Sequence, residues 1–258
     1  MRIATWNVNS LTARLPRVEE WIAYAHPDVL CMQETKQADD AFPVDAFTSL
    51  GYETAHHGDG RWNGVAIASR VGLTEVKTGM GSDDDAQGTR LIAADCGGVR
   101  VHSVYVPNGR SLDSEHYPAK LAWLARLREL LEETTEPDRP VAVCGDFNVA
   151  PEDRDVWSPK EFEGMTHVSP PEREALGRLE SWGLVDAFRR LYDDDKVFSW
   201  WDYRGGSFHR HQGMRIDLIL VTEVLAATTT YGLIDRQARK GEKPSDHAPV
   251  FIDTAVEG

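Results

Sequence analysis

Polar side chains stand at the ends of several short apolar runs in this sequence. Asn7 and Glu34 follow the first two runs, Gly145-Asp146-Phe147-Asn148 follows a later one, and Ser245-Asp246-His247-Ala248 leads into the last. Strand ends are places where side chains from different strands can meet, so we expect these clusters to converge on one cleft. Carboxylates, amides and one histidine in a cleft are the groups that metal-assisted cleavage of a phosphodiester uses.

Glu34 is the first candidate ligand for a divalent cation. A carboxylate at a strand end binds a hard cation through oxygen, and Mg²⁺ typically takes one or two such ligands and keeps several waters. A lone glutamate in this position would more often be a solvated residue that caps a loop. The amides of Asn7 and Asn9 favour a site, because neutral amides orient ligands and water without adding negative charge against a phosphate.

Asp146 and Asn148 lie two residues apart in an extended segment, so their side chains are expected to point the same way. In a site, one residue would accept a proton and the other would donate to a phosphate oxygen. The alternative is a plain turn, which aspartate and asparagine also favour.

His247 is the sharpest candidate in the sequence, with Asp246 beside it. A neutral histidine can act as a base, and a protonated one can neutralise phosphate charge. It needs a carboxylate on its other ring nitrogen to fix its orientation. Asp217 is an ionisable residue inside the apolar run Ile216–Val221 and itself needs a partner if it is buried. We therefore predict an Asp217–His247 pair.

Tyr105 and Asn108 close a further strand and are expected to face the same cleft. The Tyr105 phenol could donate to a phosphate oxygen or act as a base, and the alternative is a core aromatic. Two other segments are locally basic. Trp200–Arg215 interleaves aromatic and basic side chains, and Arg236–Lys243 holds four bases and one acid just before His247. Such segments suit stacking on bases and pairing with phosphates, although charge runs are often only solvated loops.

The composition limits the class of protein. The chain has 258 residues and a net charge of −14, which argues against a protein that coats DNA without specificity. Its 3 cysteines show no CxxC spacing, so neither a disulfide framework nor a zinc cluster is indicated. The chain opens directly on a strand-like run without a signal peptide, and no apolar run is long enough to span a bilayer. We expect a soluble cytoplasmic protein, with a monomer as the default.

Strand-like runs outnumber helical ones and are interspersed with them. This pattern predicts a single α/β domain over residues 1–258, built as a four-layer α-β-β-α sandwich of two mixed β-sheets flanked by helices. Met80–Gln87 and Asp153–Ser169 are the segments expected to be mobile loops. The predicted helices cover Leu15–Tyr24, Pro118–Glu133 and a segment that begins at Pro171. The predicted strands are Ile3–Trp6, Val29–Met32, Gly64–Ser69, Leu91–Ala94, Val99–Val106, Val141–Cys144, Phe198–Trp201, Ile216–Val221, Thr228–Leu233 and Pro249–Asp253.

The ordered set of motifs resembles the exonuclease III family of abasic-site endonucleases, within the endonuclease/exonuclease/phosphatase superfamily. Each motif is weak alone, but together they span nearly the whole chain in the family's order. They are Trp6-Asn7-Val8-Asn9-Ser10-Leu11, Gln33-Glu34-Thr35-Lys36, Asn63-Gly64-Val65-Ala66-Ile67, Tyr105-Val106-Pro107-Asn108-Gly109, Gly145-Asp146-Phe147-Asn148, Phe198-Ser199-Trp200-Trp201-Asp202-Tyr203-Arg204, Arg215-Ile216-Asp217 and Ser245-Asp246-His247-Ala248-Pro249.

The resemblance implies a sandwich fold and a DNA-repair hydrolase that uses Mg²⁺, with Mn²⁺ as a substitute. The implied reaction cuts double-stranded DNA 5′ to an abasic site and leaves a 3′-hydroxyl. Removal of nucleotides in the 3′→5′ direction and of phosphate groups from damaged 3′ ends is also implied.

The resemblance also implies roles for individual residues. Glu34 is the main metal ligand, and the rest of the implied metal-site set is Asn7, Asn9, Asp146, Asn148, Asp246 and His247. The implied catalytic set is Tyr105, Asp146, Asn148, Asp217 and His247, with either Asp146 or a Tyr105 phenolate as the base. The implied DNA contacts are Lys36, Arg90, Asn108, Lys120 and Arg204, with Trp200, Met214 and Ile216 forming an apolar pocket for a flipped abasic sugar.

Two positions depart from the family pattern, and two rival functions stay open. Asn9 stands where some relatives carry aspartate, and Met214 stands where some carry tryptophan. The nearest rival is another phosphoesterase of the superfamily, acting on inositol phosphates, sphingomyelin or RNA tails, which would share the same catalytic clusters. A rival of another class is a DNA-binding scaffold without turnover.

Overall fold

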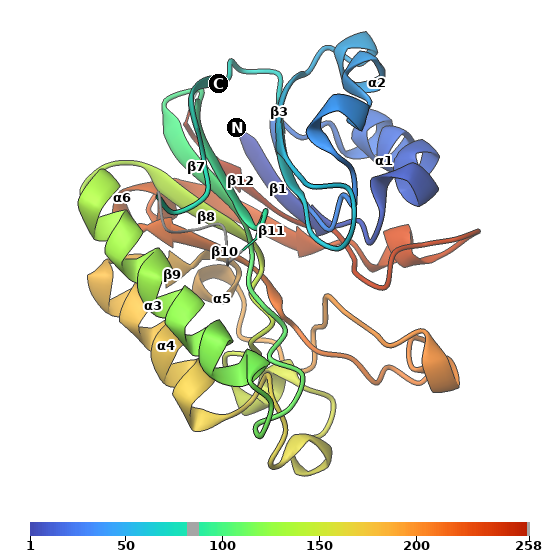
Figure 1. The fold of residues 1–258 in the computed structure, drawn as a ribbon, viewed down its shortest axis with the longest axis vertical. Helices are drawn as coiled ribbons and strands as arrows, with labels where there is room; N and C mark the ends of the chain where they lie inside the picture. The colour runs from blue at the N-terminus through green and yellow to red at the C-terminus, as the bar shows by residue number, and fades with distance from the viewer. Residues whose placement is uncertain (82–87, 257–258) are drawn as a thin grey trace.

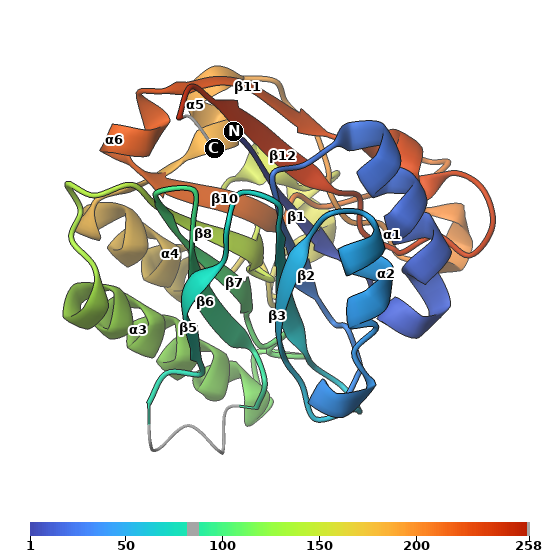
Figure 2. The ribbon, with the colours of Figure 1, turned by 90° about the horizontal axis from the view of Figure 1, so that it is seen from above.

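Two β-sheets stack face to face and helices cover both outer surfaces (Figure 1). From above, α3 (His116–Thr134) and α4 (Pro170–Trp182) lie on one side of the sheets, and α1 (Leu11–Ala25) and α2 (Val44–Ser49) lie on the other (Figure 2). The predicted four-layer α-β-β-α sandwich is therefore confirmed. The computed structural model describes residues 1–81 and 88–256.

Each sheet has six strands, with a parallel pair at its centre and antiparallel neighbours around it. The first sheet has the order β11-β12-β1-β2-β4-β3 and the second has the order β5-β6-β7-β8-β10-β9. The parallel pairs are β1 with β2 and β7 with β8. The first sheet consists of β1 (Arg2–Asn7), β2 (Val29–Gln33), β3 (Glu53–His57), β4 (Val65–Ser69), β11 (Thr229–Ile234) and β12 (Val250–Thr254). The second consists of β5 (Thr74–Thr78), β6 (Leu91–Cys96), β7 (Val99–Tyr105), β8 (Val141–Asp146), β9 (Leu184–Asp186) and β10 (Asp217–Thr222).

The remaining helices are short. They are α5 (Ala187–Leu191) and α6 (Glu223–Ala226), together with the 3₁₀ turns η1 (Asp39–Ala41), η3 (Asp153–Asp155), η4 (Pro159–Phe162), η5 (Arg204–Gly206) and η6 (Arg236–Arg239). Helix α1 begins earlier than predicted, at Leu11, so Pro16 lies inside the helix and not in its first turn.

The alternation of side chains along the central strands creates separate apolar layers. Cys31 and Cys144 face the core between the two sheets. Leu30 faces outward onto the cluster under α1 and α2, and Val143 faces outward onto the cluster under α3. Because each central strand is buried on both faces, its sequence reads as a continuous apolar run. This is why these strands could be predicted.

One predicted strand is wrong, and three strands were missed. Phe198–Trp201 forms no strand, although Trp200 makes isolated bridges to Met214 and His247. The edge strands β3, which is mostly half-buried, and β5, which is exposed, were missed because their polar residues carry little apolar pattern. The short β9 was missed as well. Of the predicted mobile loop at Met80–Gln87, residues 82–87 lie outside the described part of the chain.

Among the helices of the described residues, none combines the length and the apolar character that crossing a bilayer requires.

Gly145 fixes the close approach of β8 to β7, and its replacement gives a test of this packing. A Cβ atom at Gly145 would lie 1.9 Å from the carbonyl oxygen of Val104, which is backbone and cannot turn away. We predict that Gly145→Ala lowers the free energy of unfolding by about 1–3 kcal/mol, as overpacking does. The matched control is Gly177→Ala in α4, where no atom lies within 4 Å of the added Cβ and a gain of about 0.5–1 kcal/mol is expected. Urea unfolding measures both variants, and a Gly145→Ala protein as stable as the wild type would contradict the packing described.

Candidate active site

The first sheet brings Asn7 and Glu34 together through its central parallel pair. Asn7 is the last residue of β1 and lies opposite Gln33, the last residue of β2. Glu34 follows directly with a φ of 49°, in the left-handed region, so the chain turns sharply there. The Asn7 amide Nδ2 donates to Glu34 Oε1 at 2.9 Å. Neighbouring ends of parallel strands therefore place this pair, as the sequence indicated.

The second sheet supplies Tyr105, Asp146 and Asp217 in the same way. Tyr105 and Asp146 are opposite residues at the ends of the parallel strands β7 and β8. Asp217 begins β10 and lies opposite Asp146 in the antiparallel pair. Three side chains from distant parts of the sequence thus meet at one end of the sheet. Asp146 is 2 % exposed and Asp217 is 1 % exposed.

The two groups converge across the interface between the sheets. Ligand atoms of Glu34, Asp146 and His247 all lie within 4.8 Å of one another. The same Asn7 amide that binds Glu34 also donates to Asp146 Oδ2, at 3.0 Å. One amide therefore links a carboxylate of the first sheet to a carboxylate of the second. Two carboxylates beside neutral amide groups are a donor set that suits a hard divalent cation.

The predicted Asp217–His247 pair is present. His247 Nδ1 lies 2.8 Å from Asp217 Oδ2, and His247 Nε2 lies 3.8 Å from Asp146 Oδ2. Burial lowers the pKa of His247, but the charges of Asp217 and Asp146 outweigh burial and raise that pKa to about 10. The ring is therefore a cation at neutral pH. A doubly protonated imidazole has no lone pair for a metal ion, so in this state His247 provides positive charge and is not a ligand.

Asp146 is the carboxylate best suited to accept a proton. Burial raises its pKa to about 7, with the charges of Asp217 and Glu34 adding to the effect and His247 opposing it. A base is most effective when its pKa lies near the working pH. The pKa of Tyr105 moves well above its usual value, because of burial and then the charges of Glu34 and Asp146. The Tyr105 hydroxyl therefore stays protonated and serves as a donor in the metal-free protein.

Asn148 and Asn108 form one continuous hydrogen-bonded unit beside Asp146. The backbone N–H of Asn148 donates to Asp146 Oδ1 at 2.9 Å, and the Asn108 amide donates to Asn148 Oδ1 at 3.0 Å. The Asn148 amide donates to the carbonyl oxygen of Val106 at 2.9 Å. Both asparagine side chains are thus held in fixed orientations next to Asp146.

Lys120 is not placed where the predicted DNA contact would need it. Its side chain is completely buried, and its ammonium group donates to the carbonyl oxygen of Asn148 at 2.6 Å and pairs with Glu172. The pKa of Lys120 is lowered by burial, which the Glu172 charge only partly offsets. Lys120 therefore supports Asn148 from within the protein. The predicted direct contact of Lys120 with DNA is corrected, because the ammonium group is buried. Helix periodicity gave no warning, because a lysine is rarely buried unless it is paired.

Asn9, Lys36 and Asp246 surround the far side of Glu34. Lys36 Nζ lies 3.0 Å from Glu34 Oε2 and donates to Asn9 Oδ1 at 2.7 Å. Asn9 Nδ2 donates to Asp246 Oδ1 at 2.9 Å, and Trp200 Nε1 donates to Asp246 Oδ2 at 3.0 Å. These bonds connect Asp246 to the site through Asn9. The pKa of Asp246 is lowered although burial opposes this, because the charge of His247 and the two hydrogen bonds favour its charged form.

A small buried apolar cluster lies next to this polar cluster, to which the Trp200–Asp246 hydrogen bond connects it. Met214 and Ile216 pack with Ala150 and Val156, and Trp200 is partly buried against them. Arg90 stacks over the Tyr105 ring, with 4.6 Å between the guanidinium carbon and the ring centroid. Trp200, Met214 and Ile216, the residues of the predicted apolar pocket, are therefore neighbours. Arg204 is separate, because it is highly exposed and forms an ion pair with Asp202.

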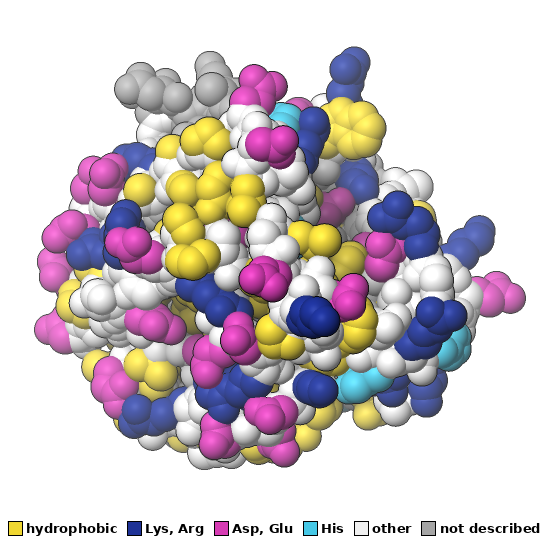
Figure 3. Space-filling view, turned by 90° about the horizontal axis from the view of Figure 1, so that it is seen from below, with side chains coloured by type: hydrophobic (Ala, Val, Ile, Leu, Met, Phe, Trp, Pro, Cys, Tyr) yellow, Lys and Arg dark blue, Asp and Glu magenta, His cyan; other side chains and the backbone are white. Residues whose placement is uncertain are grey.

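The two basic segments form a projecting rim beside the site. Lys and Arg side chains gather toward the right of the face seen from below, with histidine among them (Figure 3). Arg236 lies over the Phe208 ring at 4.4 Å, and Arg239 lies over the same ring at 5.0 Å. Arginine–aromatic stacking thus ties the two segments to each other, while His209 and Arg210 stay exposed.

His167 was missed by the sequence analysis although it touches this site. Its Nε2 lies 3.3 Å from the Asn108 amide nitrogen. Burial and the Lys120 charge lower the pKa of His167 to about 3, so the ring is neutral and can accept from Asn108. The signal in the sequence was only one histidine in a loop, and nothing in its spacing connects it to Asn108.

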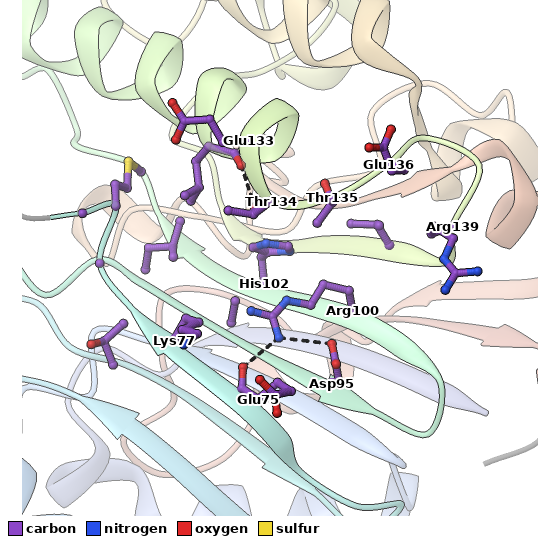
Figure 4. Close-up of a pocket in the computed structure, with 18 of the residues that line it drawn as sticks. Glu75, Lys77, Asp95, Arg100, His102, Glu133, Thr134, Thr135, Glu136 and Arg139 are labelled. Carbon is purple, nitrogen blue, oxygen red and sulfur yellow. Dashed lines mark hydrogen bonds and ion pairs between the residues drawn. The ribbon is translucent and has the colours of Figure 1, made fainter.

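A hollow of the described surface lies elsewhere. It encloses about 950 Å³ between the outer face of β5–β7 and the end of α3, with His102 in its floor and Arg100, Arg139 and Glu133 around it (Figure 4). It contains none of the convergent carboxylates, so this hollow is separate from the site described above.

Comparison with known proteins matches this geometry to a family. The model of the Endonuclease/Exonuclease/phosphatase family matches residues 4–247. The chain belongs to this family. Exodeoxyribonuclease III of Haemophilus influenzae is 36 % identical, and the match covers 98 % of this chain and 99 % of that protein.

Two solved structures show the same family fold over the full length of the chain. An AP endonuclease from Archaeoglobus fulgidus superposes with a TM-score of 0.96 at 39 % identity, covering 99 % of this chain and 100 % of that one. The 3′ phosphatase NExo from Neisseria, bound to a product DNA hairpin, gives a TM-score of 0.95 at 39 % identity and covers 98 % and 99 %.

The charge on His247 predicts how the stability of the metal-free protein depends on pH. An unfolded histidine has a pKa near 6.5, whereas the pKa of His247 in the folded state is about 10. The folded protein therefore keeps a proton that the unfolded chain loses, and the stabilisation is full below about pH 6.5 and is lost as the pH rises toward 10. We expect the free energy of unfolding, measured with urea in the presence of EDTA, to fall less steeply with pH in Asp146→Asn/His247→Gln than in Asp146→Asn, a background without the linked titration of Asp146. Equal slopes for the two proteins would show that His247 is not charged.

Proposed function

We propose that this protein is a DNA-repair phosphodiesterase that cuts duplex DNA 5′ to abasic sites and trims damaged 3′ ends. The observation that carries the proposal is the convergence of Glu34, Asp146 and His247 within 4.8 Å at the meeting point of the two sheets. The names of the relatives support the substrate: an exodeoxyribonuclease III, an AP endonuclease and a 3′ phosphatase with a DNA hairpin product. We further propose that the enzyme acts as a cytoplasmic monomer.

We propose Mg²⁺ as the cofactor, with Mn²⁺ as a substitute. Glu34 would hold the ion, with Asp146 and the Asn9 and Asp246 pair at its sides. The oxygen-rich donor set fits a hard cation, and Lys36 contacts one of the two carboxylate oxygens of Glu34. When bound, the ion supplies positive charge to the phosphate oxygens and to the leaving oxygen.

The protein's own groups have separable tasks in hydrolysis. Asp146, with its pKa near neutrality, accepts a proton from the attacking water. Asn148 and Asn7 orient that water and the phosphate. The protonated His247, held by Asp217, faces the negative charge that develops on the phosphoryl oxygen. The Tyr105 hydroxyl donates a hydrogen bond to another phosphate oxygen.

Substrate recognition divides between phosphate contacts and an apolar pocket. Lys36, Arg90, Asn108 and Arg204 would bind the phosphate backbone. Trp200, Met214 and Ile216 would receive an abasic sugar, which a nucleotide with a base fills poorly. The net negative charge of the chain is compatible with this, because the basic residues gather on the rim seen in Figure 3.

Incision of a duplex that carries a tetrahydrofuran abasic analogue tests the proposal. We expect Mg²⁺-dependent cutting by the wild type, loss of cutting with EDTA, and a decrease of about 10²–10⁴-fold in rate for Asp146→Asn, because the base is removed. The rate of cutting by Glu34→Gln should fall by a similar factor. Glu20→Gln, on the exposed face of α1, is the control and should cut at the wild-type rate. Release of phosphate from an inositol phosphate, with the DNA left intact, would contradict the proposal.

A further inference from the structure

The turn that carries Glu34 has an unusual backbone. Glu34 has a φ of 49° and Lys36 has a φ of 53°, so two non-glycine residues on either side of Thr35 are left-handed. Each such residue is unfavourable and persists only where the surrounding structure fixes it. The side chains of Glu34 and Lys36 contact each other at 3.0 Å and both belong to the site. Something must therefore hold this turn in place.

Thr35 is the point at which the turn is anchored. It is completely buried, its N–H donates to the carbonyl oxygen of Gly64 at 3.1 Å, and its carbonyl oxygen accepts from Leu11 N at 2.9 Å. A Cβ atom on Gly64 would lie 2.1 Å from Thr35 Oγ1, so only glycine allows this approach. The remaining polar atom, Oγ1, lies 2.8 Å from His56 Nε2. The anchor thus ends on a side chain from another strand.

His56 is itself held on three sides. It belongs to β3, which lies at the edge of the first sheet under α2 (Figure 2). Its ring stacks on Phe42 with 4.4 Å between centroids, its side chain is 5 % exposed, and its Nδ1 lies 2.8 Å from Asp39 Oδ1. Asp39 is fixed in turn by the N–H of Gly58, at 2.7 Å.

The protonation of this histidine suits one role. Burial lowers the pKa of His56, although Asp39 opposes the change, so the ring is neutral at pH 7. Nδ1 lies beside the Asp39 carboxylate, whose negative charge favours the single ring proton on Nδ1, although the contact lacks hydrogen-bond geometry. Nε2 then has a lone pair, which accepts the hydroxyl proton of Thr35. Asp39, His56 and Thr35 therefore form a continuous series of contacts, an ion-pair contact followed by a hydrogen bond, that ends one residue from Glu34.

We propose that His56 is a positioning residue for the metal site, acting through Thr35 to fix the orientation of Glu34 and Lys36. The inference rests on the proposed role of Glu34 as a metal ligand. Thr35 is completely buried and its Oγ1 contacts His56, so this series of contacts orients the site and takes no part in the reaction. Groups that orient a ligand from behind typically contribute about 10–100-fold to metal affinity.

Direct binding of Mn²⁺, followed by electron paramagnetic resonance of the free ion, tests the proposal without DNA. We expect His56→Phe, which keeps the ring stacked on Phe42 but removes the acceptor, to bind Mn²⁺ about tenfold more weakly. Thr35→Val should lose a similar factor, and Thr35→Ser, which keeps the hydroxyl, should bind nearly as the wild type does. The double variant His56→Phe/Thr35→Val should be no weaker than either single variant, because the two changes break one contact.

The matched control is His57→Phe, on the opposite face of the same strand, which should leave Mn²⁺ binding unchanged. Saturating Mn²⁺ should restore DNA cutting by His56→Phe, which a general folding defect would not allow, and Thr35→Val replaces His56→Phe if that protein does not fold. If Glu34→Gln loses Mn²⁺ but His56→Phe and Thr35→Val bind like the wild type, the positioning role is wrong and the metal site stands. If the wild type binds no Mn²⁺, the proposed metal site and the positioning role both fail.

Discussion

The fold gathers acidic side chains that repel one another in a place that water reaches poorly. Asp146 and Asp217 are buried side by side, and Glu34 lies close to Asp146. Isolated carboxylates would not remain charged there, because burial without a partner is too costly. Two effects reduce this cost. The His247 ring carries a positive charge beside Asp217, and the pKa of Asp146 is raised to about 7, so Asp146 is partly neutral at pH 7. The remaining negative charge is what makes the site attractive to a cation.

The two sheets make this arrangement possible because they contribute different parts. The first sheet provides Asn7 and Glu34 from one parallel pair, and the second provides Asp146 from another. The Asn7 amide binds carboxylates of both sheets, so the relative position of the sheets sets the geometry of the site. Apolar packing between the sheets thus contributes to function, since a shift of one sheet would separate the carboxylates.

Much of the site could be predicted from the sequence because its residues sit at the ends of buried strands, which apolar runs reveal. The Asp217–His247 pair followed from the need of a buried acid for a partner. The predictions failed where the decisive contact is tertiary. The sequence around Lys120 gives no sign of burial, which depends on the ion pair with Glu172 from another helix. His56 lies on a polar edge strand that has no apolar pattern. Trp200 was assigned to a strand because its neighbours are apolar, although only isolated bridges form there.

The most direct test of the account counts the protons released when Mn²⁺ binds, by titration calorimetry in two buffers of different ionisation enthalpy. If Asp146 has a pKa of about 7 and shares the ion with Glu34, the wild type should release roughly half a proton at pH 7, more at pH 6, and almost none at pH 8. Asp146→Asn should release none of this proton at any of these values. Binding that releases no proton between pH 6 and 8, or an equal release from Asp146→Asn, would contradict the claim that the buried carboxylates form a cation site in which Asp146 is partly protonated.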